Sequence, residues 1–145
     1  MAVDASGNVY VTGYFAGTAN LGGGDVTATG SSDVFITSFT SAGGHRWQKA
    51  LGGTSSSAGL SVAVDGNGDV YVVGNYQGAA NFGGGDVTAL GSSDIFVTSF
   101  TAAGAHRWQK SLGGTSLDYC DSVAVSGSGN VYLVGDFMET ADLGG

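Results

Sequence analysis

Two copies of the pentapeptide His-Arg-Trp-Gln-Lys, at residues 45–49 and 106–110, hold every Lys, Arg, His and Trp of the chain. An indole beside a cation can stack on a sugar ring, and a guanidinium can pair with a carboxylate. The pentapeptides therefore form a candidate glycan-binding site of the lectin type. Its residues are His45, Arg46 and Trp47 with their repeats His106, Arg107 and Trp108.

The same pentapeptide also has a purely structural interpretation. In a β-strand, His45, Trp47 and Lys49 share one face while Arg46 and Gln48 share the other. The indole would then pack between neighbouring repeats, and the long cationic side chains would cover apolar surface with their stems. Repetition favours this interpretation, because every repeat needs the same packing. It does not exclude a lectin that has one glycan-binding site in each repeat.

A second candidate site is the sequence Asp-Gly-Asn-Gly-Asp at 65–69, where Asp65, Asn67 and Asp69 have the spacing that begins a calcium loop. The equivalent residues of the third copy, Ser126, Ser128 and Asn130, include no carboxylate, and no distant Glu completes the loop. A hairpin turn is the favoured interpretation, with a calcium-stabilised adhesin module as the alternative.

Enzyme chemistry is not expected. No G-x-S-x-G or H-E-x-x-H motif occurs, and the glycine triplets at 22–24 and 83–85 lack the Lys and Ser/Thr of a phosphate-binding loop. His45 and His106 sit in repeated strands, whereas a catalytic constellation is usually unique. We predict a non-enzymatic protein that needs no cofactor, with Asp25, Asp33, Asp86 and Asp94 serving as turn caps.

An internal repeat must position these residues. Shifting the chain by 61 residues aligns it on itself without a gap, with identity at about two thirds of the positions. This predicts one repeat at 1–61, a second at 62–122 and a partial third at 123–145. The copies differ most where Ser-Ser-Ala-Gly-Leu at 56–60 becomes Leu-Asp-Tyr-Cys-Asp at 117–121. That segment would be the place for a repeat protein to vary a binding surface, although neutral drift is the simpler explanation.

Each repeat reads as four antiparallel strands. In the second copy they are expected at 61–65, 69–76, 94–101 and 106–112, with a possible short strand at 86–90 and glycine-rich turns between them. No helical stripe of apolar residues occurs. Four-stranded units at a fixed period stack face to face, as the blades of a β-propeller or as a solenoid. The partial third repeat supplies the first two strands alone.

Charge and hydropathy exclude several partners. The formal net charge of −8 argues against nucleic acid and anionic membrane surfaces. No apolar run is long enough to insert in a membrane, and no signal peptide precedes the first strand-like sequence. The single cysteine, Cys120, allows no internal disulfide.

Several spaced elements resemble the bacterial β-propeller repeat family of the SBBP type. They are Ala2-Val3-Asp4, Gly7-Asn8 and Tyr10-Val11-Thr12-Gly13, followed by Asp33, Phe35, Trp47 and Leu51-Gly52-Gly53. The resemblance covers essentially the whole chain. It implies an all-β fold of four-stranded propeller blades with 61–65 as the innermost strand, 106–110 in the outermost strand, and an exported or cell-surface location.

About two and a third repeats cannot close a propeller, which generally has four to eight blades. We therefore expect open blade faces. They should be covered by other copies of the chain or by neighbouring blades of a longer chain, in a structural or interaction module.

Overall fold

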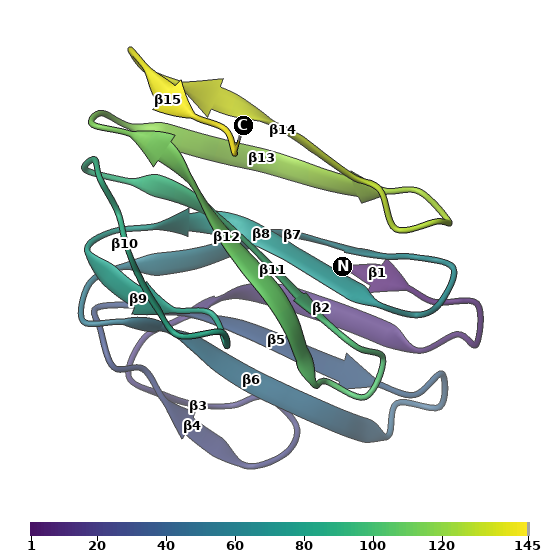
Figure 1. The fold of residues 1–145 in the computed structure, drawn as a ribbon. Helices are drawn as coiled ribbons and strands as arrows, with labels where there is room; N and C mark the ends of the chain where they lie inside the picture. The colour runs from purple at the N-terminus through teal and green to yellow at the C-terminus, as the bar shows by residue number, and fades with distance from the viewer. Residues whose placement is uncertain (145) are drawn as a thin grey trace.

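The computed structural model describes residues 1–144, and within them the fold is all-β without any helix (Figure 1). The strands are β1 (Ala2–Val3), β2 (Val9–Phe15), β3 (Thr18–Asn20), β4 (Asp25–Thr27), β5 (Asp33–Phe39), β6 (His45–Gly53), β7 (Ser57–Val64), β8 (Val70–Tyr76), β9 (Ala79–Asn81), β10 (Asp86–Thr88), β11 (Asp94–Phe100), β12 (His106–Gly114), β13 (Asp118–Val125), β14 (Val131–Phe137) and β15 (Ala141–Asp142).

The predicted four-stranded unit is confirmed. In the second repeat, β7, β8, β11 and β12 pair antiparallel in sequence order, and β1, β2, β5 and β6 do the same in the first. The β-branched and aromatic residues of these runs fit a pleated surface buried on both sides, and glycines at φ near +80° make the hairpin turns. We call these sheets unit 1 and unit 2, and β13 to β15 unit 3.

Among the four predicted strands of unit 2, two strand boundaries differ from the sequence-based prediction by two residues or more, and three others differ by a single residue. The first strand of unit 2 begins at Ser57 rather than Ser61, because a bulge between Gly59 and Ser61 lets the strand continue toward its N-terminus. The fourth strand runs on to Gly114 rather than Leu112. Both extensions lie where one unit joins the next.

The glycine-rich insertion between the second and third strands is a small hairpin, β9–β10, and it joins two units. Strand β10 ends at Thr88, two residues earlier than expected, and β9 was not predicted. In addition, β9 pairs with Gly52 and Gly53 at the end of the fourth strand of unit 1. Strand β15 pairs in the same way with Gly113 and Gly114. Each insertion therefore adds a short strand to the sheet of the preceding unit, beside the end of its fourth strand.

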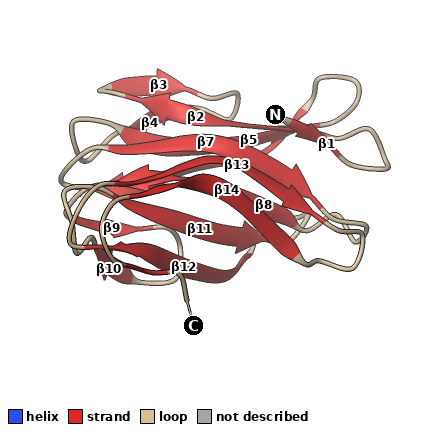
Figure 2. Ribbon diagram, turned by 90° about the horizontal axis from the view of Figure 1, so that it is seen from above, coloured by secondary structure: helices blue, strands red, loops and turns tan. Residues whose placement is uncertain are grey.

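The units stack face to face in an open array (Figures 1 and 2). Units 2 and 3 approach closely at their first strands, where the hydroxyls of Ser61 and Ser122 are 3.5 Å apart. One apolar core joins unit 1 to unit 2 and a second joins unit 2 to unit 3. The first core contains Tyr10, Val34, Ile36, Leu51, Val62, Val70, Val72, Tyr76, Ala80, Phe82, Phe96 and Phe100, and the second contains Val73, Ile95, Val97, Cys120 and Val123.

No helix among the described residues is long and apolar enough to cross a membrane.

Candidate functional site

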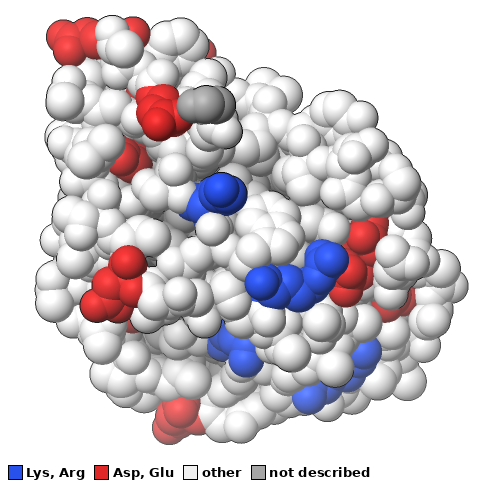
Figure 3. All heavy atoms as spheres, viewed as in Figure 1, with Lys and Arg blue, Asp and Glu red and all other residues white. Residues whose placement is uncertain are grey.

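The two pentapeptides begin β6 and β12, the fourth strands of their units. Figure 3 shows their Lys and Arg atoms gathered across the middle of one face, with acidic residues around them. Strand β6 has a β-bulge at Arg46. Ser38 and Phe39 of β5 pair with Trp47 and His45, so Arg46 lies opposite no residue. The bulge changes the simple alternation expected from the sequence, so each side chain of the pentapeptide has its own environment.

The histidine lies under the glycine triplet. A Cβ added to Gly23 would collide with Cε1 of His45, and one added to Gly84 would lie 2.7 Å from Cε1 of His106. The following glutamine fixes the same loop: Gln48 accepts a hydrogen bond from the Gly23 amide at 2.9 Å and donates one to a loop carbonyl. The triplets are loops, as predicted, and their glycines are required because an imidazole packs directly against them.

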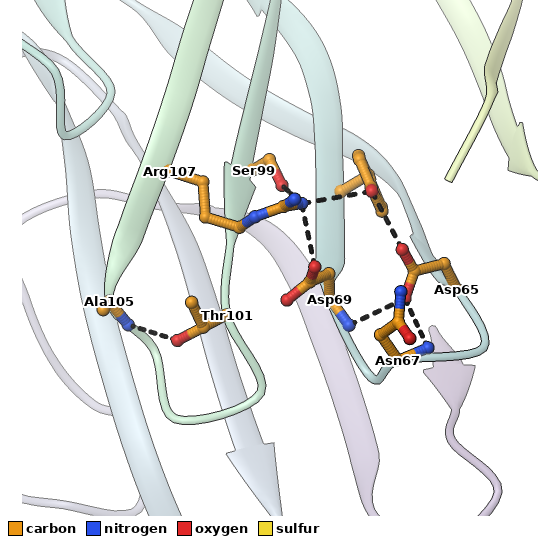
Figure 4. Close-up of polar contacts among 8 residues, drawn as sticks. Asp65, Asn67, Asp69, Ser99, Thr101, Ala105 and Arg107 are labelled. Atoms are coloured by element: carbon orange, nitrogen blue, oxygen red, sulfur yellow. Dashed lines mark hydrogen bonds and ion pairs between the residues drawn. The ribbon is translucent and has the colours of Figure 1, made fainter. Parts of the chain in front are cut away.

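The arginine is the first donor in a series of two linked side-chain hydrogen bonds. Arg46 Nη1 donates to the Tyr10 hydroxyl at 2.9 Å, and that hydroxyl donates to Asp4 Oδ2 at 3.0 Å. Unit 2 has the equivalent two hydrogen bonds, from Arg107 to Tyr71 and from Tyr71 to Asp65 (Figure 4). Burial raises the pKa of the Tyr71 hydroxyl, the hydrogen bond from Arg107 opposes this rise, and the hydrogen bond to Asp65 adds to it.

The predicted calcium residues form a hairpin turn in the structure. Asp65 Oδ1 accepts hydrogen bonds from the amides of Asn67 at 2.8 Å and Asp69 at 3.0 Å. Asp69 Oδ2 is 3.1 Å from Nη1 of Arg107, the residue that also donates to Tyr71. Among residues 1–144 no group of three or more His, Cys, Asp or Glu is placed to hold a metal ion. Calcium binding at Asp65, Asn67 and Asp69 stays a prediction. The ion would have to compete with the hydrogen bonds of Asp65 and the ion pair of Asp69.

The same turn in unit 1 makes stability depend on pH. Burial raises the pKa of the Asp4 carboxyl, but hydrogen bonds from Asn8, Tyr10 and Ser6 outweigh it, so the pKa lies below its ordinary value. A lowered pKa means that the charged form is stabilised in the folded state. This stabilisation is present above the pKa of the unfolded carboxyl and is lost as the pH falls through the folded value.

We expect Asp4→Ser, which installs the residue of unit 3, to flatten the acid limb of the stability profile. Between about pH 5 and about pH 3 the unaltered protein should lose more of its free energy of unfolding than the variant does. Urea unfolding at a series of pH values measures the difference, and parallel acid limbs would contradict the assignment.

The tryptophan of unit 1 packs between units. Its ring lies 6.0 Å from that of Tyr10 and 6.3 Å from that of Phe100 in unit 2, and Nε1 donates to the Ala102 carbonyl at 3.0 Å. Arg46 donates to the same carbonyl, and Lys49 Nζ lies 5.9 Å from the centre of the Phe100 ring. This is the packing that the structural interpretation predicts. That the Ala102 carbonyl is its acceptor could not be predicted, because the two residues lie far apart in the sequence.

The tryptophan of unit 2 has no such neighbour. Trp108 contacts Tyr71 of its own unit, with the ring centres 6.0 Å apart, and lines a hollow of about 190 Å³. The other residues around the hollow are Val97, Lys110, Leu112, Val131, Leu133, Leu143 and Gly144. Trp108 is thus the more open aromatic surface for a sugar, and glycan binding at the six predicted residues stays a prediction.

Equivalent positions in units 2 and 3 differ sharply in burial. Phe82 and Val73 are 0% exposed, whereas their equivalents Leu143 and Val134 are 59% and 64% exposed. Among the residues that the structure describes, strand β14 pairs with β13 and with no other strand. The apolar pattern of the repeat therefore continues into unit 3, where these residues include no third and fourth strand to cover it.

The turn-cap prediction is confirmed for Asp33 and Asp94. Asp33 accepts hydrogen bonds from Thr29, and Asp94 accepts them from the amides of Leu90 and Gly91. Sequence reasoning missed Asp118, which is fully buried beside Asp94. The available signal was the replacement of Ser57 by this aspartate at the equivalent position of the next repeat.

Comparison with known proteins finds similarity to short segments of much longer proteins. No family model matches it. The regulatory protein FlaEY of Caulobacter vibrioides is 32% identical over 138 residues, which cover 90% of this chain and 14% of that protein. The uncharacterized WD repeat-containing protein L264 of Acanthamoeba polyphaga mimivirus is 24% identical over 113 residues, which cover 66% of this chain and 8% of that protein. The chain spans only these small fractions of the curated relatives it matches.

Proposed function

We propose that the chain is a non-enzymatic structural and interaction module whose units stack as blades of a larger β-propeller, of the SBBP type and exported to the bacterial surface. The observation that carries this proposal is the exposure of unit 3 at positions that are buried in unit 2. An apolar surface of this kind, lined by a tryptophan and a free strand edge, is typical of an interaction site.

The opposite end of the array offers the complementary surface. Phe35 and Phe39 of unit 1 are half-buried, while their equivalents Phe96 and Phe100 are fully buried against unit 1. The two end faces therefore carry the two sides of the interface already formed between units 1 and 2. A contact between unlike faces is heterologous, and it builds rings or extended stacks.

The comparisons are consistent with this proposal. Both relatives are many times longer than the matched segment, as expected for a module that recurs or continues within a long chain. The name of the mimivirus protein records WD repeats, which form four-stranded blades.

Completing unit 3 tests the proposal directly. Gly145 aligns with Gly84, so a second copy of residues 85–114 appended after Gly145 supplies the missing third and fourth strands. We expect the melting temperature to rise by about 5 °C or more, because a further inter-unit interface forms. Amide exchange along β14 should slow at the same time, since its free edge becomes paired.

The matched control is the same extension with the copies of Phe96 and Phe100 replaced by serine, which keeps its length but removes its apolar face. An unchanged melting temperature with unprotected β14 amides in the first protein would overturn the proposal. For the chain without the extension, we expect self-association in sedimentation velocity, and a stable folded monomer at micromolar concentration would contradict that part.

A further inference from the structure

Two buried carboxylates meet at the junction of units 2 and 3. Asp94 begins β11 and is 1% exposed, and Asp118 begins β13 and is 0% exposed. Both face Gly113 of β12: a Cβ built on this glycine would lie 2.8 Å from Asp118 Oδ2 and 3.0 Å from Asp94 Oδ2. Carboxylates from two strands therefore meet over the Cα of Gly113, where a residue with a side chain would collide with them.

The hydrogen bonds around this space leave one oxygen unused. Asp94 accepts from the amides of Leu90 at 3.0 Å and Gly91 at 3.1 Å, and Asp118 Oδ2 accepts from the Gly114 amide at 2.7 Å. Asp118 Oδ1 is buried and has no hydrogen-bond partner. Within the described chain neither carboxylate forms an ion pair with Lys, Arg or His. Two buried anions without a counter-charge are costly unless a cation joins them.

A pocket of about 270 Å³ lies beside Gly113 and has Asp94 in its lining, while the fully buried Asp118 is not part of that lining. Its lining includes Thr88, Ser111 and Asp142, the last on the strand β15 that pairs with Gly113. The exposed Asp142 carboxylate adds negative charge at this pocket. Oxygen ligands of mixed type, in an irregular arrangement, suit Ca²⁺ better than the strict octahedron of Mg²⁺.

The junction of units 1 and 2 contains the same arrangement without the second buried carboxylate. Asp33 packs against Gly52 as Asp94 packs against Gly113, but Ser57 of β7 stands where the next junction has Asp118 of β13. The Ser57 hydroxyl is also buried without a hydrogen-bond partner. The second junction thus adds two negative charges, Asp118 in place of Ser57 and Asp142 in place of Asn81, and the first of them stands at a position that already holds an unpartnered oxygen.

We propose that one Ca²⁺ ion binds per chain between Asp94 and Asp118, beside Gly113. The site is separate from the Asp65 turn, where the carboxylates are engaged by Asn67, Asp69, Tyr71 and Arg107. It does not depend on the stacking proposal, because all of its protein ligands lie in the described chain. Its position would tie the end of unit 2 to the first strand of unit 3.

Isothermal titration with CaCl₂, and with MgCl₂ as the ion control, tests the site in the chelator-treated full chain. We expect one Ca²⁺ per chain and a melting temperature about 5–10 °C higher at a hundredfold excess over Kd. Asp118→Ser, which installs the residue found at the junction of units 1 and 2, should remove both effects. Ser57→Asp places a second carboxylate beside Asp33 and should raise the stoichiometry to two. Asp65→Ser, which installs the residue of unit 3 in the turn, should leave binding unchanged.

Absence of Ca²⁺ binding up to about 10 mM would overturn the proposal, since this exceeds the Kd range of weak extracellular sites. Binding that survives in Asp118→Ser would overturn it too, and binding lost in Asp65→Ser but kept in Asp118→Ser would move the ion to the hairpin turn. If Asp118→Ser does not fold, the stoichiometry of Ser57→Asp decides, because a value that stays at one contradicts the predicted ligand pair.

Discussion

Replacement of Trp47 by alanine is expected to lower the free energy of unfolding by about 3–5 kcal/mol, the usual cost of removing a large packed aromatic side chain. The indole fills the space between the rings of Tyr10 and Phe100 and donates a hydrogen bond to the Ala102 carbonyl. Its removal leaves a cavity in the core that joins units 1 and 2, and it leaves Arg46 as the remaining donor to the Ala102 carbonyl. Guanidinium unfolding followed by circular dichroism gives the value.

Trp108 provides a matched control within the same molecule. It occupies the same position one repeat later, but no aromatic residue from a following third strand covers it. We expect Trp108→Ala to cost about 1–2 kcal/mol, because the indole is less fully packed. Equal losses in the two variants would mean that the inter-unit contact adds nothing, and would argue against stacking as the source of stability.

The repeat made most of the fold predictable. Identity at a spacing of 61 residues, together with alternating runs such as Asp94–Phe100, is sufficient to give four antiparallel strands per unit. The turns followed from local chemistry, since Asp65 folds back on the amides of Asn67 and Asp69. Features of this kind depend on neighbours in sequence, which is where pattern reasoning is strong.

The pentapeptide was harder to interpret because its partners are distant in sequence. His45 is fixed by glycines more than twenty positions earlier, and Trp47 by Ala102 more than fifty positions later. The crossing of β9 to β6 was missed for the same reason. A single sequence shows that these residues recur, but it does not show which of them meet.

The glycine pair after the pentapeptide offers the second large effect. A Cβ on Gly53 would collide with the Ala79 carbonyl oxygen and lie 2.8 Å from the Ala80 Cα. Both obstacles are backbone atoms of β9, the strand that pairs with Gly53. The clash therefore cannot be relieved by the rotation of a side chain. We expect Gly53→Ala to cost about 2–3 kcal/mol, because β9 must separate from β6 or both strands must shift.

Two further glycines supply the controls for this prediction. Gly114 is the equivalent position one repeat later and faces the Thr140 carbonyl, but its partner β15 contains two residues and lies at the exposed end of unit 3. Gly114→Ala should therefore cost about 1 kcal/mol or less, and Gly127→Ala, with nothing within 4 Å of the new methyl, should change stability by no more than about 0.5 kcal/mol.

Hydrogen exchange at residues 79–81 distinguishes the mechanism from general destabilisation. If Gly53→Ala acts by parting β9 from β6, exchange in this segment should accelerate more than exchange in β8 or β11, which keep their own neighbours. Uniform acceleration along the chain would show instead that the hairpin has no separate role in joining the units. The link between units 1 and 2 would then rest on their shared apolar core and on the Trp47 contact, and the Trp47→Ala loss would measure the second of these.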